Sequence, residues 1–402
     1  MNLRTKFPAL LLAAALIFSL AACSGDADKD VNPSPTPEVS DVTDAPDLTD
    51  SENSSILPDD FEPDTSVEDL YLATADLPGD FELFTVNGQP VSARMYLYWL
   101  AYSISEIEST YAYYGMSLDW SEELGLAEYM MADALNATLM YTLVPAKAKE
   151  LGFELTAEQI AEFDTYTADT IEAMGGEEEF RESLRMLGLD RDTYLNINRA
   201  PYYYSRIVEG LFADRPTDAD VDAYIKDNDI LSAKHILLLT MDMTTREPLA
   251  DDVIAQKKAT AEDLLKQLQE SDDLAADFDA LMNEYSEDTG LAANPDGYVF
   301  SSGEMVTEFE EGTRALEYGQ MSGIVESPYG YHIILRQAPD SESLRDDCLS
   351  WLASEQINAW VSEADLVFSD EYANLNAQLF YEKFISYQAA FAAEKTLASQ
   401  AN

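Results

Sequence analysis

Two short apolar runs interrupt a sequence that is otherwise mostly helical in its pattern, and each run begins at a histidine. They read AKHILLL at residues 233–239 and YHIILRQ at residues 331–337, and the sequence of 402 residues contains 2 histidines. Apolar runs of this length, rich in β-favouring residues, are typical of buried strands. Because helical patterns precede, separate and follow the two strands, we predict an α+β fold.

The order of patterns along the chain predicts an insertion. Residues 77–229 start with two short strands around the turn signal Asn87-Gly88 and continue with helices. Residues 230–338 follow the order strand, helix, helix, short strand or loop, helix and strand, and residues 339–402 are helical again. We therefore expect a compact module with a small central sheet and surrounding helices, inserted between two helical segments that pack on each other.

Local signals divide the helical segments further. Thr156, followed three residues later by Gln159, forms a capping-box pattern, and Thr217 is the capped start of another helix. Pro145 lies inside an apolar helical pattern, where its missing N–H and its ring predict a kink or a break.

The first residues, MNLRTKFPALLLAAALIFSLAAC, have the outline of a secretory signal, with a basic start at Arg4 and Lys6, an apolar stretch and then small residues. The apolar stretch is short for a membrane span. The segment LAAC, which ends at Cys23, resembles the lipobox of bacterial lipoproteins. This implies a signal peptide over residues 1–22 and a diacylglyceryl group on the Cys23 thiol, with plain secretory cleavage as the alternative. We expect an exported protein anchored by lipid at the extracytoplasmic face of a bacterial cell membrane.

The segment that follows the expected anchor, residues 23–76, is rich in Pro, Ser, Thr and Asp. Such a segment cannot bury enough apolar surface to offset its conformational entropy, and its like charges keep it extended. We predict a disordered acidic tether over these residues, with folded structure beginning near Leu77.

The charge balance of the chain excludes some partners. The sequence has 23 basic and 77 acidic residues, for a net charge of −54. No basic stripe is available to neutralise phosphates, so we expect no nucleic acid partner, and the same charge opposes adhesion to anionic lipid heads. The acidity is typical of a heavily solvated surface. Calcium binding is a weaker alternative, because no D-x-[DN]-x-[DN]-G loop is present.

Cys348 is the second cysteine of the chain and has no disulfide partner if Cys23 is lipidated. The folded parts are then expected to rely on packing alone. Cys348 lies at helical spacing from Trp351 and Leu352, which indicates a buried apolar thiol rather than a nucleophile.

Five consecutive motifs in the central segment belong together. In order they read SAKHILL, AEDLLKQL, DFDALMNEYSEDTG, FSSGEMVTEFEEGTRAL and GQMSGIVESPYGYHIILR. In this order and spacing, residues 230–338 resemble the parvulin-type (PpiC, rotamase) peptidyl-prolyl cis–trans isomerases. The flanking segments FTVNGQPVSARMYLYWLA, KAKELGFELTAEQIAEF and GGEEEFRESLRMLGLDRDTYL are similar to the chaperone region of SurA-like and PrsA-like foldases. The resemblance implies a foldase lipoprotein in which residues 339–402 fold back onto the N-terminal helices.

Isomerisation of this kind requires no nucleophile and no metal. Rotation about an X–Pro bond faces a barrier of ~18–20 kcal/mol from amide resonance, and the site must bind the twisted amide better than the planar forms. The resemblance implies an extracytoplasmic prolyl isomerase and chaperone that acts on unfolded or partly folded exported polypeptides with X–Pro bonds. It implies no cofactor, and it leaves a homodimer open.

The resemblance also implies roles for individual residues. His235 and His332 correspond to the paired histidines of the family's central strands, and Asp288 falls where the family places an acid or a cysteine beside the twisting amide. We take these three as the candidate catalytic residues. The histidines either support the pocket floor or act on the substrate directly, and Asp288 either serves the amide or caps a turn. A metal site at the histidines is not expected, because no third ligand is evident.

Four further residues are implied as substrate-binding. Met305 and Phe309 match the apolar wall that receives the proline ring, and core packing is the alternative for both. Ser286 lies in the loop of the candidate acid, and Tyr329 lines up with a hydroxyl-bearing position before the second histidine.

The sequence departs from the family pattern at the pocket wall. Many parvulins have GGDLGWF where residues 294–300 read NPDGYVF, so that Gly297 replaces a wall leucine in a gapless alignment. Tyr298 takes the place of that leucine, or the pocket is shallower. A holdase chaperone whose parvulin domain docks peptides with little or no activity is therefore the alternative function. Arg246 is alone among several acids in the loop after the first strand, which argues against phosphoserine–proline specificity.

Client binding has its own candidate segments in the helical regions, which are YAYY, PYYYSRI and YMMADALNATLMY. Tyrosines and methionines at a promiscuous surface suit many unfolded partners, and the alternative, which we favour for any single residue, is packing in a helical core. The acidic surface is expected to steer basic segments of clients. A solute-binding lipoprotein would fit the lipobox and tether but not the parvulin motifs.

Overall fold

The computed structural model describes residues 55–58, 60–121 and 125–400. The expected signal peptide, the candidate lipidation site Cys23 and most of the expected tether lie outside these residues. The described chain divides into two compact units, one within Thr43–Ala213 and Ala353–Asn402 and the other within Asp214–Leu352. None of the helices in the described ranges is long and apolar enough to cross a membrane.

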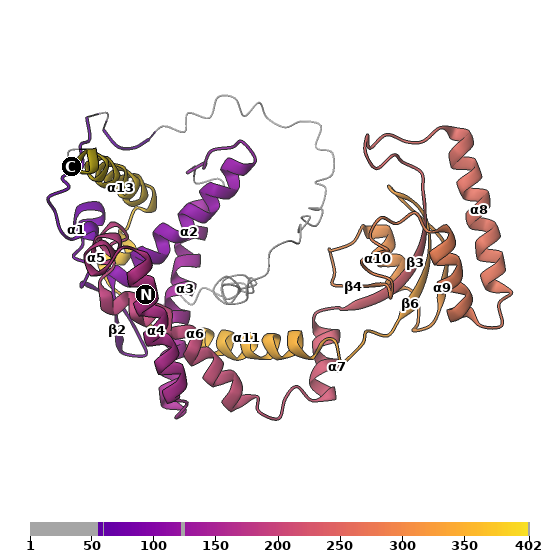
Figure 1. Ribbon diagram of the computed structural model, residues 1–402, viewed down its shortest axis with the longest axis horizontal. Helices are drawn as coiled ribbons and strands as arrows, with labels where there is room; N and C mark the ends of the chain where they lie inside the picture. Colours follow the sequence, from indigo (N-terminus) through magenta and orange to yellow (C-terminus); the bar gives the residue numbers. More distant parts are fainter. Residues whose placement is uncertain (1–54, 59, 122–124, 401–402) are drawn as a thin grey trace. The chain divides into compact units, whose positions relative to one another are not determined.

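The first of these, the helical unit, combines helices with one small sheet (Figure 1). Its last elements follow the boundary at Ala353, which falls inside α11. In chain order its elements are α1 (Leu70–Ala75), β1 (Glu82–Val86), β2 (Gln89–Ser92), α2 (Ala93–Tyr113), α3 (Leu126–Glu150), α4 (Ala157–Ala173), α5 (Glu177–Met186), α6 (Arg191–Leu211), the end of α11 (Arg345–Glu363), β7 (Leu366–Phe368), α12 (Asp370–Ala373) and α13 (Ala377–Gln400).

The small sheet of the helical unit has the strand order β2-β1-β7, with antiparallel pairing throughout. Asn87 and Gly88 join β1 to β2 with φ angles of 53° and 74°, the left-handed values that a tight hairpin turn needs. The predicted hairpin is therefore confirmed. Phe84 of β1 pairs with Phe368 of β7, so a strand from the C-terminal segment completes the sheet.

The C-terminal helix α13 also fills the main core of this unit. Phe380, Tyr381 and Phe384 of α13 lie in one buried cluster with Tyr71 of α1 and Leu97 of α2. Removing each large apolar side chain from water stabilises the fold by roughly 1.5–3 kcal/mol. The C-terminal segment is thus built into the same core as the N-terminal helices.

The expected tether over residues 23–76 extends too far, because α1 lies within it. The Asp69 carboxylate caps this helix by accepting a hydrogen bond from the Tyr71 N–H. Tyr71 is fully buried, and its hydroxyl donates to the Leu187 carbonyl at 2.8 Å. Composition averaged over an acidic segment does not reveal one short helix that docks through two apolar side chains, Leu70 and Tyr71.

The local helix signals are partly confirmed. Thr156 starts α4 and Thr217 starts α7 (Asp218–Asp227), each with a capping box. Of the kink or break predicted at Pro145, the break is wrong, because α3 continues through Pro145 to Glu150. The flanking side chains, including Leu143 and Val144, are buried, and this packing holds the helix together despite the lost backbone hydrogen bond.

The second unit, the sheet unit, contains a four-stranded antiparallel sheet of order β4-β3-β6-β5. The predicted α+β fold, with a small-sheet module between helical segments of the sequence, is confirmed. After α7 the elements are β3 (Leu231–Leu239), α8 (Asp251–Gln269), α9 (Leu274–Tyr285), β4 (Tyr298–Phe300), α10 (Thr307–Arg314), β5 (Met321–Ser327), β6 (Gly330–Gln337) and the first turns of α11.

The central strands β3 and β6 are buried on both faces. Ile236 and Ile333 pack on the face that α8 and α9 cover, while Ala233 and Ile334 pack on the face that α10 covers with Phe309. Figure 1 shows α10 on one side of the sheet and α8 and α9 on the other. Because both faces are buried, each strand reads as a continuous apolar run rather than as an alternation.

The strand β5 was not predicted, because the sequence analysis assigns one strand, not a hairpin, to the last motif. Ser322, Gly323 and Glu326 interrupt the apolar pattern of β5, and its pairing with β6 is irregular between Met321 and Ile324. Such edge strands carry weak sequence signals.

Cys348 of α11 is a free, fully buried thiol. It packs in an apolar cluster with Val221, Ile230 and Leu344, and burial raises its pKa. The prediction of a buried apolar thiol is confirmed.

Candidate functional site

The two histidines lie on adjacent strands and on the same face of the sheet. In the pairing of β3 with β6, His235 is opposite Ile334 and His332 is opposite Leu237. The two rings are therefore diagonal neighbours, with centroids 5.3 Å apart and planes 25° from parallel. They lie on the face that α10 covers.

A chain of hydrogen bonds runs through both rings. His235 Nε2 is 3.0 Å from Asp288 Oδ2, and His235 Nδ1 is 3.1 Å from His332 Nδ1. His332 Nε2 is 2.7 Å from Ser327 Oγ, which also accepts the Tyr329 N–H at 3.2 Å. An ionised carboxylate only accepts, so His235 donates from Nε2 and, when neutral, accepts at Nδ1 from His332. His332 then accepts from the Ser327 hydroxyl, and all four ring nitrogens have partners.

The loop that follows α9 positions Asp288. Ser286 Oγ accepts the Leu237 N–H at 3.1 Å, and the Glu287 carboxylate accepts the Leu239 N–H at 2.9 Å. The Glu287 N–H donates to the Leu237 carbonyl at 2.8 Å. The loop thus pairs with the edge of β3 beyond residues 231–233, where β4 pairs. This docking brings the carboxylate beside His235.

The electrostatics of the site favour an ionised Asp288 carboxylate and a neutral His332 imidazole. Burial alone would raise the pKa of Asp288, but hydrogen bonds from His235, from the Tyr298 hydroxyl at 2.6 Å and from the Gly290 N–H at 3.0 Å outweigh it and lower the pKa to about 2. Burial, followed by the neighbouring His235, lowers the pKa of His332 to about 3. Burial and then the hydrogen bond to Asp288 raise the pKa of Tyr298. At neutral pH the Asp288 carboxylate is therefore ionised and the His332 ring is neutral.

Phe309 covers both histidine rings from α10. Its ring centroid is 5.0 Å from that of His235 and 5.6 Å from that of His332. Only 3% of Phe309 is exposed. Met305, just before α10, packs on the same cluster but is half-buried. Of the two expected wall residues, Met305 is therefore the more accessible.

Gly297 is not a position for a wall side chain. Its φ is 95°, and a Cβ there would lie 2.6 Å from the Ala233 carbonyl oxygen, so a larger residue would collide with the backbone of β3. A gapless replacement of a wall leucine does not fit this geometry. Tyr298 reaches the site instead, with its ring edge-on to His235 at 5.7 Å and its hydroxyl on Asp288.

The two remaining candidates differ in what their atoms do. The Ser286 hydroxyl oxygen accepts the Leu237 N–H and so holds the loop. Tyr329 lies in the turn between β5 and β6, where its carbonyl accepts the Thr240 N–H at 2.9 Å. Ser327, which the sequence did not predict as a site residue, is buried and contacts His332 directly. The sequence indicates Ser327 only through its position at the end of β5, and that position becomes clear once β5 and β6 are recognised as a hairpin.

This arrangement can bind and orient a ligand, but it presents no activated nucleophile. The imidazole nitrogens and the carboxylate oxygens accept or donate within the array. Across the described ranges, no group of three or more side chains is arranged to hold a metal ion. Chemistry that depends on fixed dipoles and an apolar cover fits such a site.

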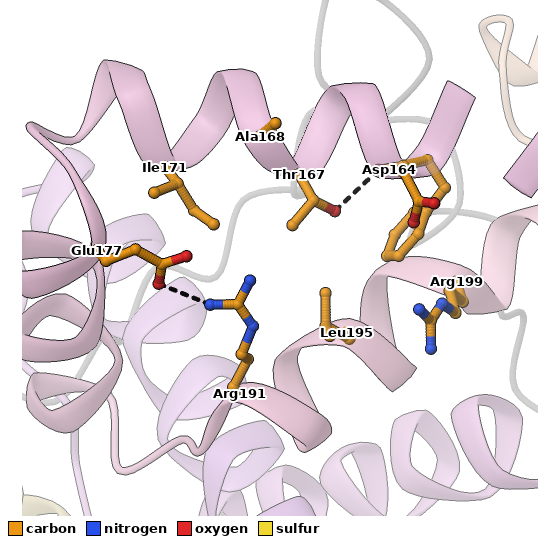
Figure 2. Close-up of a pocket in the computed structure, with 9 residues that line it drawn as sticks. Asp164, Thr167, Ala168, Ile171, Glu177, Arg191, Leu195 and Arg199 are labelled. Atoms are coloured by element: carbon orange, nitrogen blue, oxygen red, sulfur yellow. Dashed lines mark hydrogen bonds and ion pairs between the residues drawn. The ribbon is translucent and has the colours of Figure 1, made fainter. Parts of the chain in front are cut away.

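The helical unit has a pocket of its own, with a volume of about 340 Å³. Figure 2 shows Arg191 and Arg199 on either side of Leu195, with Thr167 and Ile171 across from them. Arg191 pairs with Glu177 at 2.7 Å, and the Arg199 guanidinium lies 4.7 Å from the Phe163 ring centroid. The sequence analysis did not predict this pocket, because its lining comes from three separate helices: Phe163, Asp164, Thr167, Ala168, Ile171, Glu177, Arg191, Leu195 and Arg199.

Comparison with known proteins begins with the sheet unit. Residues 235–338 match the family described as "Rotamase: PPIC-type PPIASE domain", and this range includes both histidines, Asp288 and Phe309. The sheet unit contains a parvulin-type domain. The resemblance stated from the five motifs of the parvulin domain is confirmed.

This chain is also similar to two curated relatives and to a solved structure. The foldase protein PrsA of Oceanobacillus iheyensis is 29% identical over 220 residues, which are 51% of this chain and 60% of the relative. PrsA of Halalkalibacterium halodurans is 42% identical over 87 residues, 21% of this chain and 25% of the relative. The chain thus spans less than two thirds of the length of either relative. A crystal structure of PrsA from Bacillus cereus is 21% identical with a TM-score of 0.30, covering 67% of this chain and 95% of that one.

Proposed function

We propose that this chain is an extracytoplasmic peptidyl-prolyl cis–trans isomerase and chaperone that assists the folding of exported proteins. The observation that carries the proposal is the buried array of Asp288, His235 and His332 under Phe309, within a domain that matches the parvulin family. The similarity to PrsA foldases supports the chaperone role. Its clients are unfolded or partly folded exported polypeptides with X–Pro bonds.

The reaction proposed for the site is a rotation about an amide bond of the substrate, in which no covalent bond is made or broken. A twisted amide loses resonance, so a site accelerates rotation when it holds the twisted form better than the planar forms. Met305 and Phe309 supply an apolar surface for the proline ring, with Tyr298 packed beside them. Tyr329, in the turn between β5 and β6, is a further substrate-binding residue in this proposal. Little water then remains to solvate the planar amide dipole.

The histidines and Asp288 act in this proposal as positioning residues. Their polar atoms are engaged with one another and with Ser327 and Tyr298, so proton transfer to substrate would first break the array. A stiff array fixes the Tyr298 and Phe309 rings that the substrate meets. Ser286 contributes by holding the loop of Asp288.

The organisation around the domain is also a proposal. It comprises a signal peptide over residues 1–22, the tether from 23, a chaperone region formed by 77–229 and 339–402, and the parvulin domain at 230–338. The LAAC segment supports lipid attachment at Cys23 and so a place at the extracytoplasmic face of the membrane. Mass spectrometry of the membrane fraction should find a diacylglyceryl group on Cys23, and Cys23→Ser should release the protein. A homodimer stays open.

The test of isomerase activity is the cis/trans exchange rate of a proline tetrapeptide, measured by NMR with the purified chain. The chain should accelerate exchange strongly, and Phe309→Leu should reduce the acceleration by about tenfold or more through loss of the ring that faces the proline. Val299→Thr is the matched control, because Val299 neighbours Tyr298 on β4 but is exposed. No acceleration by the folded chain would refute the isomerase.

The alternative is a holdase whose parvulin domain docks peptides without turning them over. One observation favours it, since Phe309 and His332 are each only 3% exposed and the floor of the site is closed in this conformation. The same experiment separates the two functions. Binding of an unfolded protein without any acceleration of exchange would establish the holdase.

A further inference from the structure

The helical unit carries a group of exposed aromatic and apolar side chains on one pair of helices. They lie on α2, on the segment that follows it and on the first turns of α3. Figure 1 shows the C-terminal end of α2 extending beyond the neighbouring helices of its unit. We call the group the tyrosine surface; it consists of Tyr102 (50% exposed), Tyr113 (83%), Tyr114 (59%), Met116 (49%) and Tyr129 (53%).

These side chains do not belong to the core of the helical unit. The buried residues of α2 end at Ile104, and beyond it the inward side is formed by Ile107 and Tyr111, which pack partly buried on the core. Tyr102 and Tyr113 are eleven residues apart, about three helical turns, so they share the opposite side. The rings of Tyr113 and Tyr114 are in contact, with centroids 5.2 Å apart, and exposed apolar side chains in contact mark a binding surface more often than scattered ones do.

The stretch of sequence that forms the tyrosine surface carries charge of one sign. No lysine or arginine occurs between Arg94 and Lys147, whereas acidic residues recur throughout that stretch. Glu106 follows Tyr102 by four residues on α2, so the two side chains are neighbours on the helix surface. Burial, and then the charges of Glu106 and Asp133, raise the pKa of Tyr102. Aromatic faces combined with carboxylates attract the cationic side chains of Lys and Arg.

We propose that the tyrosine surface binds unfolded segments that combine basic with aromatic or aliphatic residues. This inference rests on the proposed chaperone function and names the class of client segment for it. A second copy of this chain is a poor occupant, because it would bring the same acidic surface and a net charge of −54. Anionic lipid is repelled for the same reason.

The experiment uses two short, unfolded, proline-free peptides with identical apolar residues, one carrying Lys and Arg and the other Asp and Glu. Their binding to the purified chain is measured by fluorescence anisotropy. The chain should bind the basic peptide about tenfold more tightly than the acidic one. The triple variant Tyr113→Ser/Tyr114→Ser/Met116→Ser should lose about tenfold in affinity for the basic peptide.

The matched control replaces three exposed apolar side chains elsewhere in the helical unit, Leu151→Ser/Ile160→Ser/Met174→Ser (42%, 47% and 44% exposed). It should bind the basic peptide as the parent does. Circular dichroism verifies the helical content of both triple variants. Because all substituted side chains are exposed, both are expected to fold.

The outcomes separate this inference from the function on which it rests. Unchanged affinity in the Tyr113 triple variant, or equal affinity of the parent for both peptides, overturns the inference while leaving a chaperone. Binding of neither peptide removes the chaperone function itself. Self-association of the parent that the triple variant abolishes, seen by sedimentation, would assign the surface to a second copy and also overturn the inference. Prolyl exchange, measured in parallel, should be unchanged in the variant.

Discussion

At the scale of single residues, the Tyr298 hydroxyl connects the wall of the site to its charge. It donates to Asp288 Oδ2 at 2.6 Å, on the same oxygen that His235 contacts. Both contacts lower the pKa of the carboxyl. The residue therefore has two separable roles, one through its ring and one through its hydroxyl.

Tyr298→Phe removes the hydroxyl and keeps the ring. The pKa of Asp288 should rise from about 2 toward its ordinary value, because one of its donors is gone. The unfolding free energy should fall by about 1 kcal/mol. Carbon-detected NMR titration of the Asp288 carboxyl measures the change in its pKa, and urea unfolding measures the change in unfolding free energy. An unchanged titration of Asp288 would contradict the hydrogen-bond geometry, and Val299→Thr serves as the control.

His332 makes the stability of the sheet unit depend on pH. Its pKa falls from an ordinary 6.5 to about 3 on folding, so between these values the unfolded chain binds a proton that the folded chain does not. The stabilisation is fully present above about pH 6.5 and is lost as the pH falls toward 3, with a slope approaching about 1.4 kcal/mol per pH unit.

Urea unfolding followed by NMR signals of the sheet unit, between about pH 7.5 and pH 5, measures this slope. His332→Gln should flatten it. Relief of repulsion among the many acids acts in the opposite direction, but it is common to both proteins and cancels in the comparison. Equal slopes in parent and variant would show that His332 is not the group responsible.

At the scale of elements, the turn before β4 decides how the pocket wall is built. A leucine at Gly297 would meet the Ala233 carbonyl and a φ of 95°. We expect Gly297→Leu to lower the unfolding free energy of the sheet unit by about 1–3 kcal/mol and to leave prolyl exchange no faster. Thermal unfolding measures the loss of stability, and the tetrapeptide assay measures the rate of prolyl exchange. A stable variant with faster exchange would show that the wall does have room for a leucine there.

The elements that were best predicted from the sequence are those whose burial is visible in their own pattern of apolar residues. β3 and β6 are buried on both faces, so each appears as an apolar run, and their alternation puts His235 and His332 on one face. The strands that were missed, β5 and β7, lie at sheet edges or have only three residues. α1 was hidden by the acidic composition around it.

The contacts of the site depend on strand pairing and loop docking between distant parts of the sequence, which no local residue pattern reveals. Ser327 reaches His332 only because β5 and β6 form a hairpin, and Tyr298 reaches Asp288 only because the loop after α9 docks on β3. The resemblance to parvulins supplied Asp288 and Phe309. It did not supply Ser327, and its gapless alignment puts the family's wall leucine at Gly297, where the backbone leaves no room for a leucine.

At the scale of the whole molecule, the helical unit is made of two separated pieces of sequence. Removing residues 353–402 takes away β7 and the α13 side chains Phe380, Tyr381 and Phe384 from its core. We expect the truncated chain to lose the cooperative unfolding transition of the helical unit and to keep that of the parvulin domain. Circular dichroism and calorimetry resolve the two transitions.

Removing only residues 396–402 is the matched control for this truncation. It leaves Phe391, the last buried side chain of the main core, in place, so both transitions should remain. A helical transition that survives loss of residues 353–402 would contradict the shared core.

Because the chain is made from its N-terminus, the two units become able to complete their folding at different times. The parvulin domain lies within one continuous stretch, Asp214–Leu352, whereas the helical unit waits for β7 and α13 near the end of the sequence. During synthesis, the parvulin domain is therefore able to finish folding while the apolar surfaces that α13 covers are still exposed. For that interval the helical unit is incompletely folded and exposes apolar side chains, as the proposed clients of this chain do.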